Sequence, residues 1–194
     1  MIRGIIFDCY GVLVSGSLDY LRSLAPADKR QEFTDLCRAA DTGFISRQEY
    51  VEGASLLIGR SADDIKAIIS KQEVRSVEML AYVKQLRKNY RTAMLSNVGH
   101  GSIERLFRAD ELEELFDAVV LSSGIGMAKP SIEAYEHVAS QLDLTPDECV
   151  MIDDIPFNVE GAEMAGMQGV VFTGFASCKA EVERLTREDH ARTA

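Results

Sequence analysis

The chain has 194 residues, 46% of them hydrophobic and 27% charged, which is the composition of a folded globular protein with one main core. Its formal net charge of -10 at pH 7 argues against nucleic-acid binding, since nonspecific binding of that kind requires cationic side chains that neutralise phosphates. Arg3 and Asp8 interrupt the apolar run near the N-terminus, so no segment is long enough to cross a membrane, and we expect a cytoplasmic protein.

The first predicted element is a strand within residues 2–14, an apolar stretch that is interrupted by Asp8 and then by a glycine, Gly11. This order places Asp8 at the C-terminal end of the strand. In an open α/β sheet, ligands bind at that edge, and a carboxylate there can act as a nucleophile or a metal ligand. An aspartate that only opens a turn after an edge strand has the same local pattern, so Asp8 alone does not decide between the two.

Apolar residues recur at helical spacing between residues 18 and 88, which predicts a helical insertion after the first strand. Ser46 with Glu49, and Ser61 with Asp64, have the spacing of capping boxes and predict the starts of two helices. Turn-forming residues interrupt the helical pattern at three places: Pro26, residues 41–43 and residues 59–61.

The rest of the chain alternates between predicted strands and helices. The predicted strands occupy residues 92–95, 116–121, 149–152 and 169–172. The predicted helices run through residues 103–107, after Lys129 and Pro130, over residues 158–166, and from Ser177 onward. This alternation predicts an α/β fold, a doubly wound parallel sheet with the helical insertion as a lid. We assign residues 1–14 and 86–194 to the core domain and residues 15–85 to a helical cap.

Polar groups follow several of the predicted strands or lie in adjoining loops: Asp8, Ser96 with Asn97, Lys129, and Asp153 with Asp154. Because the carboxyl ends of parallel strands meet at one edge, we expect these groups to converge. Paired carboxylates after an apolar strand repel one another unless a cation joins them. The sequence therefore predicts a cation, from a side chain or a metal ion, at Asp153 and Asp154.

These motifs, in this order, resemble the four motifs of the haloacid dehalogenase-like (HAD) hydrolase superfamily, and the resemblance spans essentially the whole chain. Residues 43–50 and 153–162 are similar to the branch with a small helical cap, which includes the phosphatase domain of soluble epoxide hydrolases and bacterial sugar-phosphate phosphatases. The resemblance implies a Rossmann-like core and a Mg²⁺-dependent phosphatase that acts on a small phosphomonoester.

The resemblance also implies a role for each motif residue. Asp8 would attack phosphorus and form a phosphoaspartate. Mg²⁺ would be held by three carboxylates and one backbone carbonyl, those of Asp8, Asp153, Asp154 and Tyr10. Lys129 would add a cation beside the carboxylates, and Ser96 and Asn97 would donate to the phosphoryl oxygens.

Tyr10 departs from the pattern of the family, whose phosphatases usually have a second aspartate at this position for acid-base catalysis. A phenol is a poor general base at neutral pH, so slow turnover or a replacement base is expected. Tyrosine at this position is similar to the L-2-haloacid dehalogenases, which work without Mg²⁺ and have uncharged residues where this chain has Asp153 and Asp154. A dehalogenase, or a low-activity protein that binds a phosphate ligand, therefore remains an alternative.

Substrate specificity is expected to depend on cap side chains that face the site. The candidates are Tyr20, Phe44, Arg47 and Tyr50. The sequence predicts a small-molecule phosphate ester as the partner and leaves the oligomeric state open.

Overall fold

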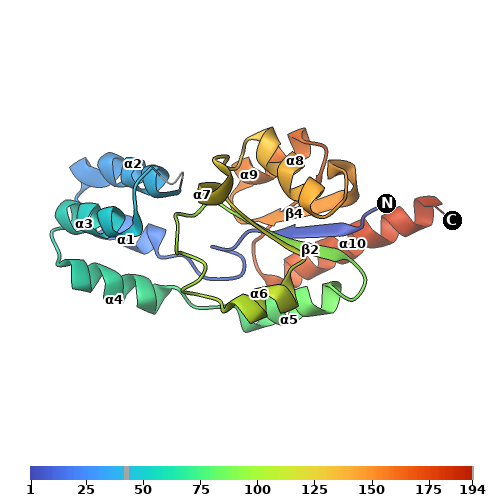
Figure 1. Cartoon of the computed structure of the whole chain (residues 1–194), viewed down its shortest axis with the longest axis horizontal. Coiled ribbons are helices and arrows are strands. Elements are labelled where there is room, and N and C mark those ends of the chain that lie inside the picture. The colour runs from blue at the N-terminus through green and yellow to red at the C-terminus, as the bar shows by residue number, and fades with distance from the viewer. Residues whose placement is uncertain (42–43, 194) are drawn as a thin grey trace.

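The computed structural model describes residues 1–41 and 44–193, and its core is a five-stranded parallel sheet in the order β3-β2-β1-β4-β5 (Figure 1). The strands are β1 (Gly4–Phe7), β2 (Arg91–Ser96), β3 (Ala118–Leu121), β4 (Cys149–Asp153) and β5 (Gln168–Val171). The ends of β2 to β5 lie within two residues of their predicted ends, and β1 lies inside the predicted 2–14 stretch and stops just before Asp8. The expected doubly wound α/β fold is confirmed, although the break predicted at residues 41–43 falls partly outside the described residues.

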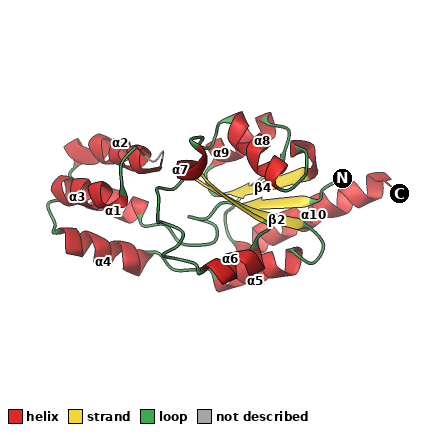
Figure 2. Cartoon of the chain, viewed as in Figure 1, coloured by secondary structure: helices red, strands yellow, loops and turns green. Residues whose placement is uncertain are grey.

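Alternate residues of each central strand enter opposite layers of the core. In β1, Ile5 and Phe7 belong to one hydrophobic cluster and Ile6 belongs to the other. The first cluster contains side chains of α5 (Val77–Leu86), α6 (Ala109–Leu115) and α10 (Phe175–Thr193). The second contains side chains of α8 (Ile132–Gln141) and α9 (Pro156–Met164). Helices therefore cover both faces of the sheet, as Figure 2 shows, and this explains why every residue of the central strands β1 and β4 is buried.

One predicted helix is wrong. Residues 103–107 form turns, and the helix of this region is α6, in the acidic segment that follows. Ile103 and Phe107 are buried in the core even so. Buried residues four positions apart are also typical of a helix, so their spacing alone does not distinguish a helix from a series of turns. A second short helix, α7 (Ser122–Ile125), follows β3 directly.

The cap is a layer of helices at the far left of Figure 1. Its elements are α1 (Leu18–Leu24), a 3-10 turn (Ala27–Lys29), α2 (Arg30–Asp41), α3 (Arg47–Ile58) and α4 (Ala62–Gln72). They enclose a separate hydrophobic cluster that includes Leu21, Phe33 and Ile65. Both predicted capping boxes are present, with Ser46 capping α3 and Ser61 capping α4.

The chain passes between core and cap at two adjacent segments. Ser15 N–H donates to the Val74 carbonyl at 2.9 Å, and Val74 N–H donates to the Ser15 hydroxyl at 2.9 Å. Beyond this crossing, the buried side chains of α5 pack in the same cluster as β1. We therefore propose that the cap ends near Arg75 and that α5 belongs to the core, so that the cap is shorter than the 15–85 segment expected from sequence.

Among the helices of the described residues, none combines the length and the hydropathy that a bilayer crossing requires.

Candidate active site at the carboxyl end of the sheet

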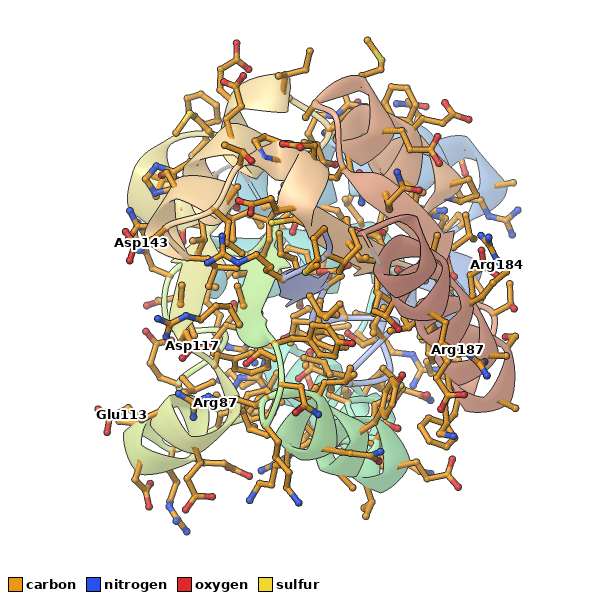
Figure 3. The ribbon with its side chains drawn as sticks, turned by 90° about the vertical axis from the view of Figure 1, so that its right-hand side faces the viewer. Arg87, Glu113, Asp117, Asp143, Arg184 and Arg187 are labelled. Atoms are coloured by element: carbon orange, nitrogen blue, oxygen red, sulfur yellow. The ribbon has the colours of Figure 1, made fainter. Side chains whose placement is uncertain are left out.

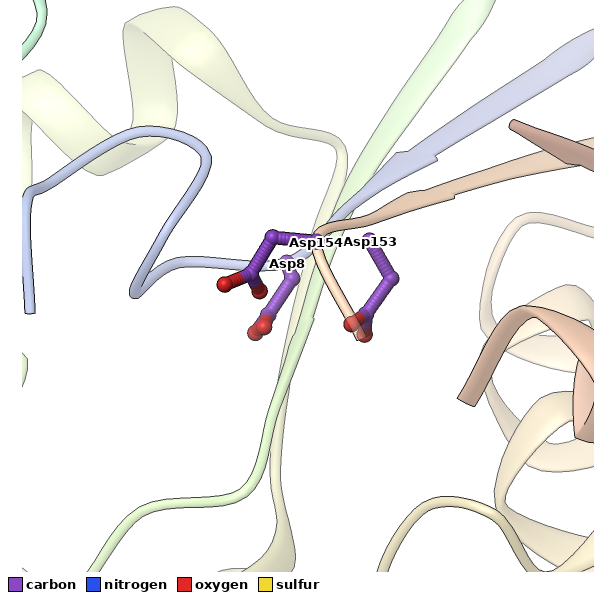
Figure 4. Close-up of side chains that lie close together, drawn as sticks. All are labelled: Asp8, Asp153 and Asp154. Carbon is purple, nitrogen blue, oxygen red and sulfur yellow. The ribbon is translucent and has the colours of Figure 1, made fainter. Parts of the chain in front are cut away.

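Three carboxylates meet where β1 and β4 end (Figure 4). Asp8 directly follows β1, Asp153 is the last residue of β4, and Asp154 comes next. The pairing of Phe7 with Ile152 puts the two strand ends side by side, and Asp8 N–H donates to the Ile152 carbonyl at 2.9 Å. One oxygen from each of the three carboxylates lies within 4.8 Å of the others. The expected convergence is confirmed for these residues.

Lys129 lies between two of these carboxylates. Its Nζ is 2.9 Å from Asp8 Oδ1 and 2.6 Å from Asp153 Oδ2, and its side chain is only 1% exposed. Burial acts to lower the pKa of Lys129, but the two carboxylates more than offset it, so the pKa is raised. Burial also raises the pKa of Asp8, against the opposing effect of Lys129. Two of the three carboxylates are thus joined by one ammonium group.

Asp153 has both of its oxygens occupied. Oδ1 accepts from Ile155 N–H at 2.8 Å, Oδ2 accepts from Lys129, and the Asn158 amide lies 3.1 Å from each oxygen. Asp153 is 0% exposed. The side chain is therefore held entirely by protein groups. Asn158 was not among the predicted site residues, although it lies in the 153–162 segment that resembles the family.

Asp154 is the exposed member of the three and faces Gly11. Gly11 has a φ of +87°, and a Cβ there would lie 2.2 Å from the Asp154 carboxylate. Only glycine fits this position, both for its left-handed backbone and for this close approach. Partial burial of the carboxyl group, together with the charges of Asp8 and Asp153, raises the pKa of Asp154 to about 6. This carboxylate lacks the ammonium partner that Asp8 and Asp153 share.

Asn97 binds the backbone of Lys129. Its amide nitrogen donates to the Lys129 carbonyl at 2.9 Å, and its amide oxygen accepts from Lys129 N–H at 2.9 Å. Asn97 also lines the site cavity, and its expected donation to phosphoryl oxygens stays a prediction. Ser96 also lines the site cavity.

Tyr10 lines the site cavity, and its hydroxyl contacts Arg105. Arg105 Nη2 donates to this hydroxyl at 3.4 Å, and Arg105 Nη1 lies 2.6 Å from Glu73 Oε2. Burial, and then the charge of Glu73, raise the pKa of the Tyr10 phenol well above its ordinary value. The phenol is therefore even less able to act as a base than a tyrosine in water. The Tyr10 backbone carbonyl accepts no hydrogen bond from the described residues.

A cavity of about 510 Å³ lies between these groups and the cap. Its core lining includes Asp8, Tyr10, Ser96, Lys129 and Asp154, and its cap lining includes Arg22, Asp41, Arg47 and Tyr50. Two of the four predicted cap residues, Arg47 and Tyr50, face this cavity. The other two do not line it: Phe44 is 86% exposed and Tyr20 is 45% exposed. Asp41 was not predicted, and a lone aspartate at a helix end gives no signal in the sequence.

The residues at this edge fit a hard divalent cation. Asp8 and Asp154 offer carboxylate oxygens and Tyr10 offers a carbonyl, and oxygen ligands of this kind suit such an ion. The excess of carboxylates over ammonium groups gives the cavity floor a negative charge that a cation would neutralise. Asp153 contributes to this charge but has no oxygen free of protein partners.

A model of the haloacid dehalogenase-like hydrolase family matches residues 2–166. A D-ribitol-5-phosphate phosphatase of Bacteroides thetaiotaomicron is 25% identical over 186 residues, which are 87% of this chain and 90% of that protein. The sesquiterpene phosphatase astK of Aspergillus oryzae is 33% identical over 92 residues, 47% of this chain, and the match spans less than half of that protein. A solved structure of a haloacid dehalogenase family enzyme from Bacteroides thetaiotaomicron, in complex with magnesium and inorganic phosphate, has a TM-score of 0.71 at 23% identity and covers 88% of this chain and 93% of that chain.

Proposed function

Because the chain belongs to the haloacid dehalogenase-like hydrolases, we propose that it is a Mg²⁺-dependent phosphatase that hydrolyses a small phosphate monoester through a phosphoaspartate at Asp8. The observation that carries this proposal is the buried ion-paired group of Asp8, Lys129 and Asp153 beside the exposed carboxylate of Asp154, all at one end of the cavity. The relatives named above as phosphatases support the same class of substrate.

Two displacements at phosphorus make up the reaction. In the first, an Asp8 oxygen bonds to phosphorus while the bond to the leaving oxygen breaks. In the second, a water oxygen bonds to phosphorus and the Asp8 carboxylate leaves. When bound by Asp8, Asp154 and the Tyr10 carbonyl, Mg²⁺ would offset the repulsion between the nucleophile and the phosphate dianion.

The remaining polar groups bind and orient. Lys129 favours the ionised form of Asp8 and supplies positive charge for the phosphoryl oxygens. The Ser96 hydroxyl would donate to one of these oxygens, since Ser96 lines the cavity. We propose that Asp153 fixes Lys129 and is not a direct metal ligand, because Lys129, Ile155 and Asn158 already satisfy its oxygens.

Dehalogenation is the second candidate, favoured by one observation, the tyrosine at position 10. A haloacid substrate carries a carboxylate, and Asp154 at the cavity wall would repel it. The dehalogenases that the sequence resembles have uncharged residues at the positions of Asp153 and Asp154. The retained acidic pair therefore favours the phosphatase.

A phosphate-release screen tests the proposal. Small phosphomonoesters are incubated with the protein in Mg²⁺ or in EDTA, and halide release from L-2-chloropropionate is measured in parallel. We expect phosphate release only with Mg²⁺, and none from Asp8→Asn. Halide release without metal would instead support the dehalogenase. Tight Mg²⁺-dependent binding of phosphate esters without turnover would indicate a binding protein.

A further inference from the structure

Asp41 is the last residue of α2, and it brings a carboxyl group from the cap to the cavity that contains Asp8 and Lys129. A specific contact holds this helix end against the core. The Ser122 hydroxyl donates to the Asp41 carbonyl and accepts from Val98 N–H at 2.9 Å. The fit is close, because a Cβ at Gly99 would lie 3.0 Å from the Ala40 carbonyl oxygen. Asp41 is therefore positioned by the docking of the cap.

The hydrolysis needs a proton donor for the leaving oxygen and a base for water, and the core provides neither at the position of Tyr10. The Tyr10 phenol accepts a hydrogen bond from Arg105, and its raised pKa makes it a poor proton donor and a poorly populated base. The other described acidic side chains that line the cavity already have partners or roles. They are Asp8 as nucleophile, Asp154 beside it, Glu73 paired with Arg105, and Asp19 paired with Arg22.

We propose that Asp41 is the general acid and base of the reaction, an inference that rests on the proposed phosphatase function. In the first displacement, the phosphorus–oxygen bond of the ester breaks, its electron pair goes to the leaving oxygen, and the protonated Asp41 carboxyl gives that oxygen its proton. In the second, the Asp41 carboxylate takes a proton from water as the water oxygen bonds to phosphorus, and Asp8 leaves as a carboxylate. The proton returned to Asp41 restores the starting state.

The electrostatic surroundings of Asp41 are consistent with this role. Burial and the charge of Asp8 raise the pKa of Asp41 to about 7, against the lowering effect of Lys129. The other titratable groups close to it are Cys37 and Tyr50 of the cap, both with raised pKa values. A carboxyl group with a pKa near the working pH is suited to both donating and accepting a proton.

The location of Asp41 also couples the cap to the chemistry. The carboxyl group reaches the cavity only while the end of α2 is docked at Ser122 and Gly99. Proton transfer would thus wait for a docked cap, which at the same time encloses the substrate.

The test compares Asp41→Asn with wild type on two substrates in Mg²⁺. p-Nitrophenyl phosphate has a leaving group that needs no proton, whereas glycerol phosphate has an alkoxide leaving group that does. We expect Asp41→Asn to lower kcat/KM for glycerol phosphate by ~10²–10⁴, the range for general acid-base catalysis. With p-nitrophenyl phosphate, the variant should release one equivalent of nitrophenol in a burst as fast as that of wild type, and then turn over slowly while the phosphoenzyme accumulates.

The matched control is Asp19→Asn, which removes a carboxylate from the same cavity and should leave both substrates unaffected. A normal rate of Asp41→Asn on glycerol phosphate, with an active wild type, would overturn this inference alone. Equal slowing of the burst and of alkyl ester hydrolysis would also overturn it, since that result indicates a structural defect. A wild type that releases no phosphate from any ester would overturn the proposed function and with it the role of Asp41.

Discussion

The side chain of Asn97 and the backbone of Lys129 form two hydrogen bonds with each other, both 2.9 Å long. Asn97 lies in the loop after β2, and Lys129 lies in the loop before α8. These bonds fix the loop that carries Lys129, and the Lys129 ammonium in turn bridges Asp8 and Asp153. Asn97 also lines the site cavity, and we propose that it acts on the reaction by placing this ammonium group.

Asn97→Ala removes both bonds and leaves the two backbone groups of Lys129 without their partners. We expect a loss of about 1–3 kcal/mol in the free energy of unfolding. We also expect a fall of roughly 10–100-fold in kcat, comparable to the loss of an outer-shell partner in other sites. Urea unfolding and steady-state phosphate release measure the two effects. Asn89→Ala, at an exposed position outside the site, is the control, and an unchanged kcat in Asn97→Ala would contradict the positioning role.

Substitutions of the two neighbouring carboxylates should have different effects. Asp153→Asn breaks a buried ion pair with Lys129, and we expect it to destabilise the fold by about 3–5 kcal/mol. Asp154→Asn should change the metal-free stability much less, because this side chain is exposed, but should greatly weaken Mg²⁺ binding. Calorimetric titration measures the effect of each substitution on Mg²⁺ affinity, and thermal unfolding with and without the metal measures its effect on stability. Equal Mg²⁺ affinity in Asp154→Asn and wild type would rule out Asp154 as a ligand.

Gly11→Ala should disturb the site without touching the nucleophile. The added Cβ would lie 2.2 Å from the Asp154 carboxylate, and the backbone of residue 11 has a φ of +87°. Because the clash is with the exposed carboxylate, we expect Asp154 to be displaced and Mg²⁺-dependent activity to be lost. Gly16→Ala, where a Cβ meets nothing within 4 Å, is the matched control. Wild-type Mg²⁺ affinity in Gly11→Ala would show that Asp154 can adopt another position.

Asp117 provides a pH-dependent contribution to stability at the edge between α5, α6 and β3, where Figure 3 shows it near Arg87. Its carboxylate accepts from Thr92 N–H at 2.9 Å and from Arg87 at 3.2 Å. Burial tends to raise the pKa of Asp117, but the hydrogen bond from Thr92 N–H and the guanidinium groups of Arg87 and Arg91 lower it below the ordinary 3.8. A lowered folded-state pKa contributes stability that is present above the unfolded pKa and lost as the pH falls through the folded one.

We therefore expect Asp117→Asn to lower the stability at pH 7 by at most about 1–2 kcal/mol, since the group is partly solvated. The difference from wild type should shrink as the pH falls below 3.8 and the wild-type carboxylate takes up a proton. Urea unfolding at a series of pH values measures this. A difference that is independent of pH would show that the charge of Asp117 is not the stabilising feature.

The cap should move as a unit about the crossing near Ser15 and Val74. The cap has its own hydrophobic cluster, and the two crossing segments are joined to each other by hydrogen bonds. We expect amides of the end of α2 to exchange with deuterium faster than those of β1, and to slow when Mg²⁺ and orthovanadate are added. Lys88 and Asn89 lie between α5 and β2, away from this crossing, and should show no such change. Uniform protection of cap and sheet would contradict a moving cap.

Much of this protein follows from its sequence. Strand β1 does not show the alternation of buried and exposed residues that marks a half-buried strand, because every residue of it is buried. Even so, short apolar runs that alternate with helices indicate a parallel sheet. A parallel sheet places the ends of its strands at one edge, so the meeting of Asp8 with Asp153 and Asp154 was predictable from their positions alone. The capping boxes at Ser46 and Ser61 were equally predictable, because both partners lie within one turn of chain.

Only the tertiary structure decides what the loops do. The two bonds from Asn97 to Lys129, the closed set of partners around Asp153, and the approach of Asp41 to the cavity each join segments that sequence periodicity cannot pair. The same limit explains the error at residues 103–107, where Ile103 and Phe107 have helical spacing but the chain forms turns. Local patterns record which residues are buried and where helices begin. Which polar atoms meet across a cap and a core depends on long-range packing, and that packing is set by the whole fold.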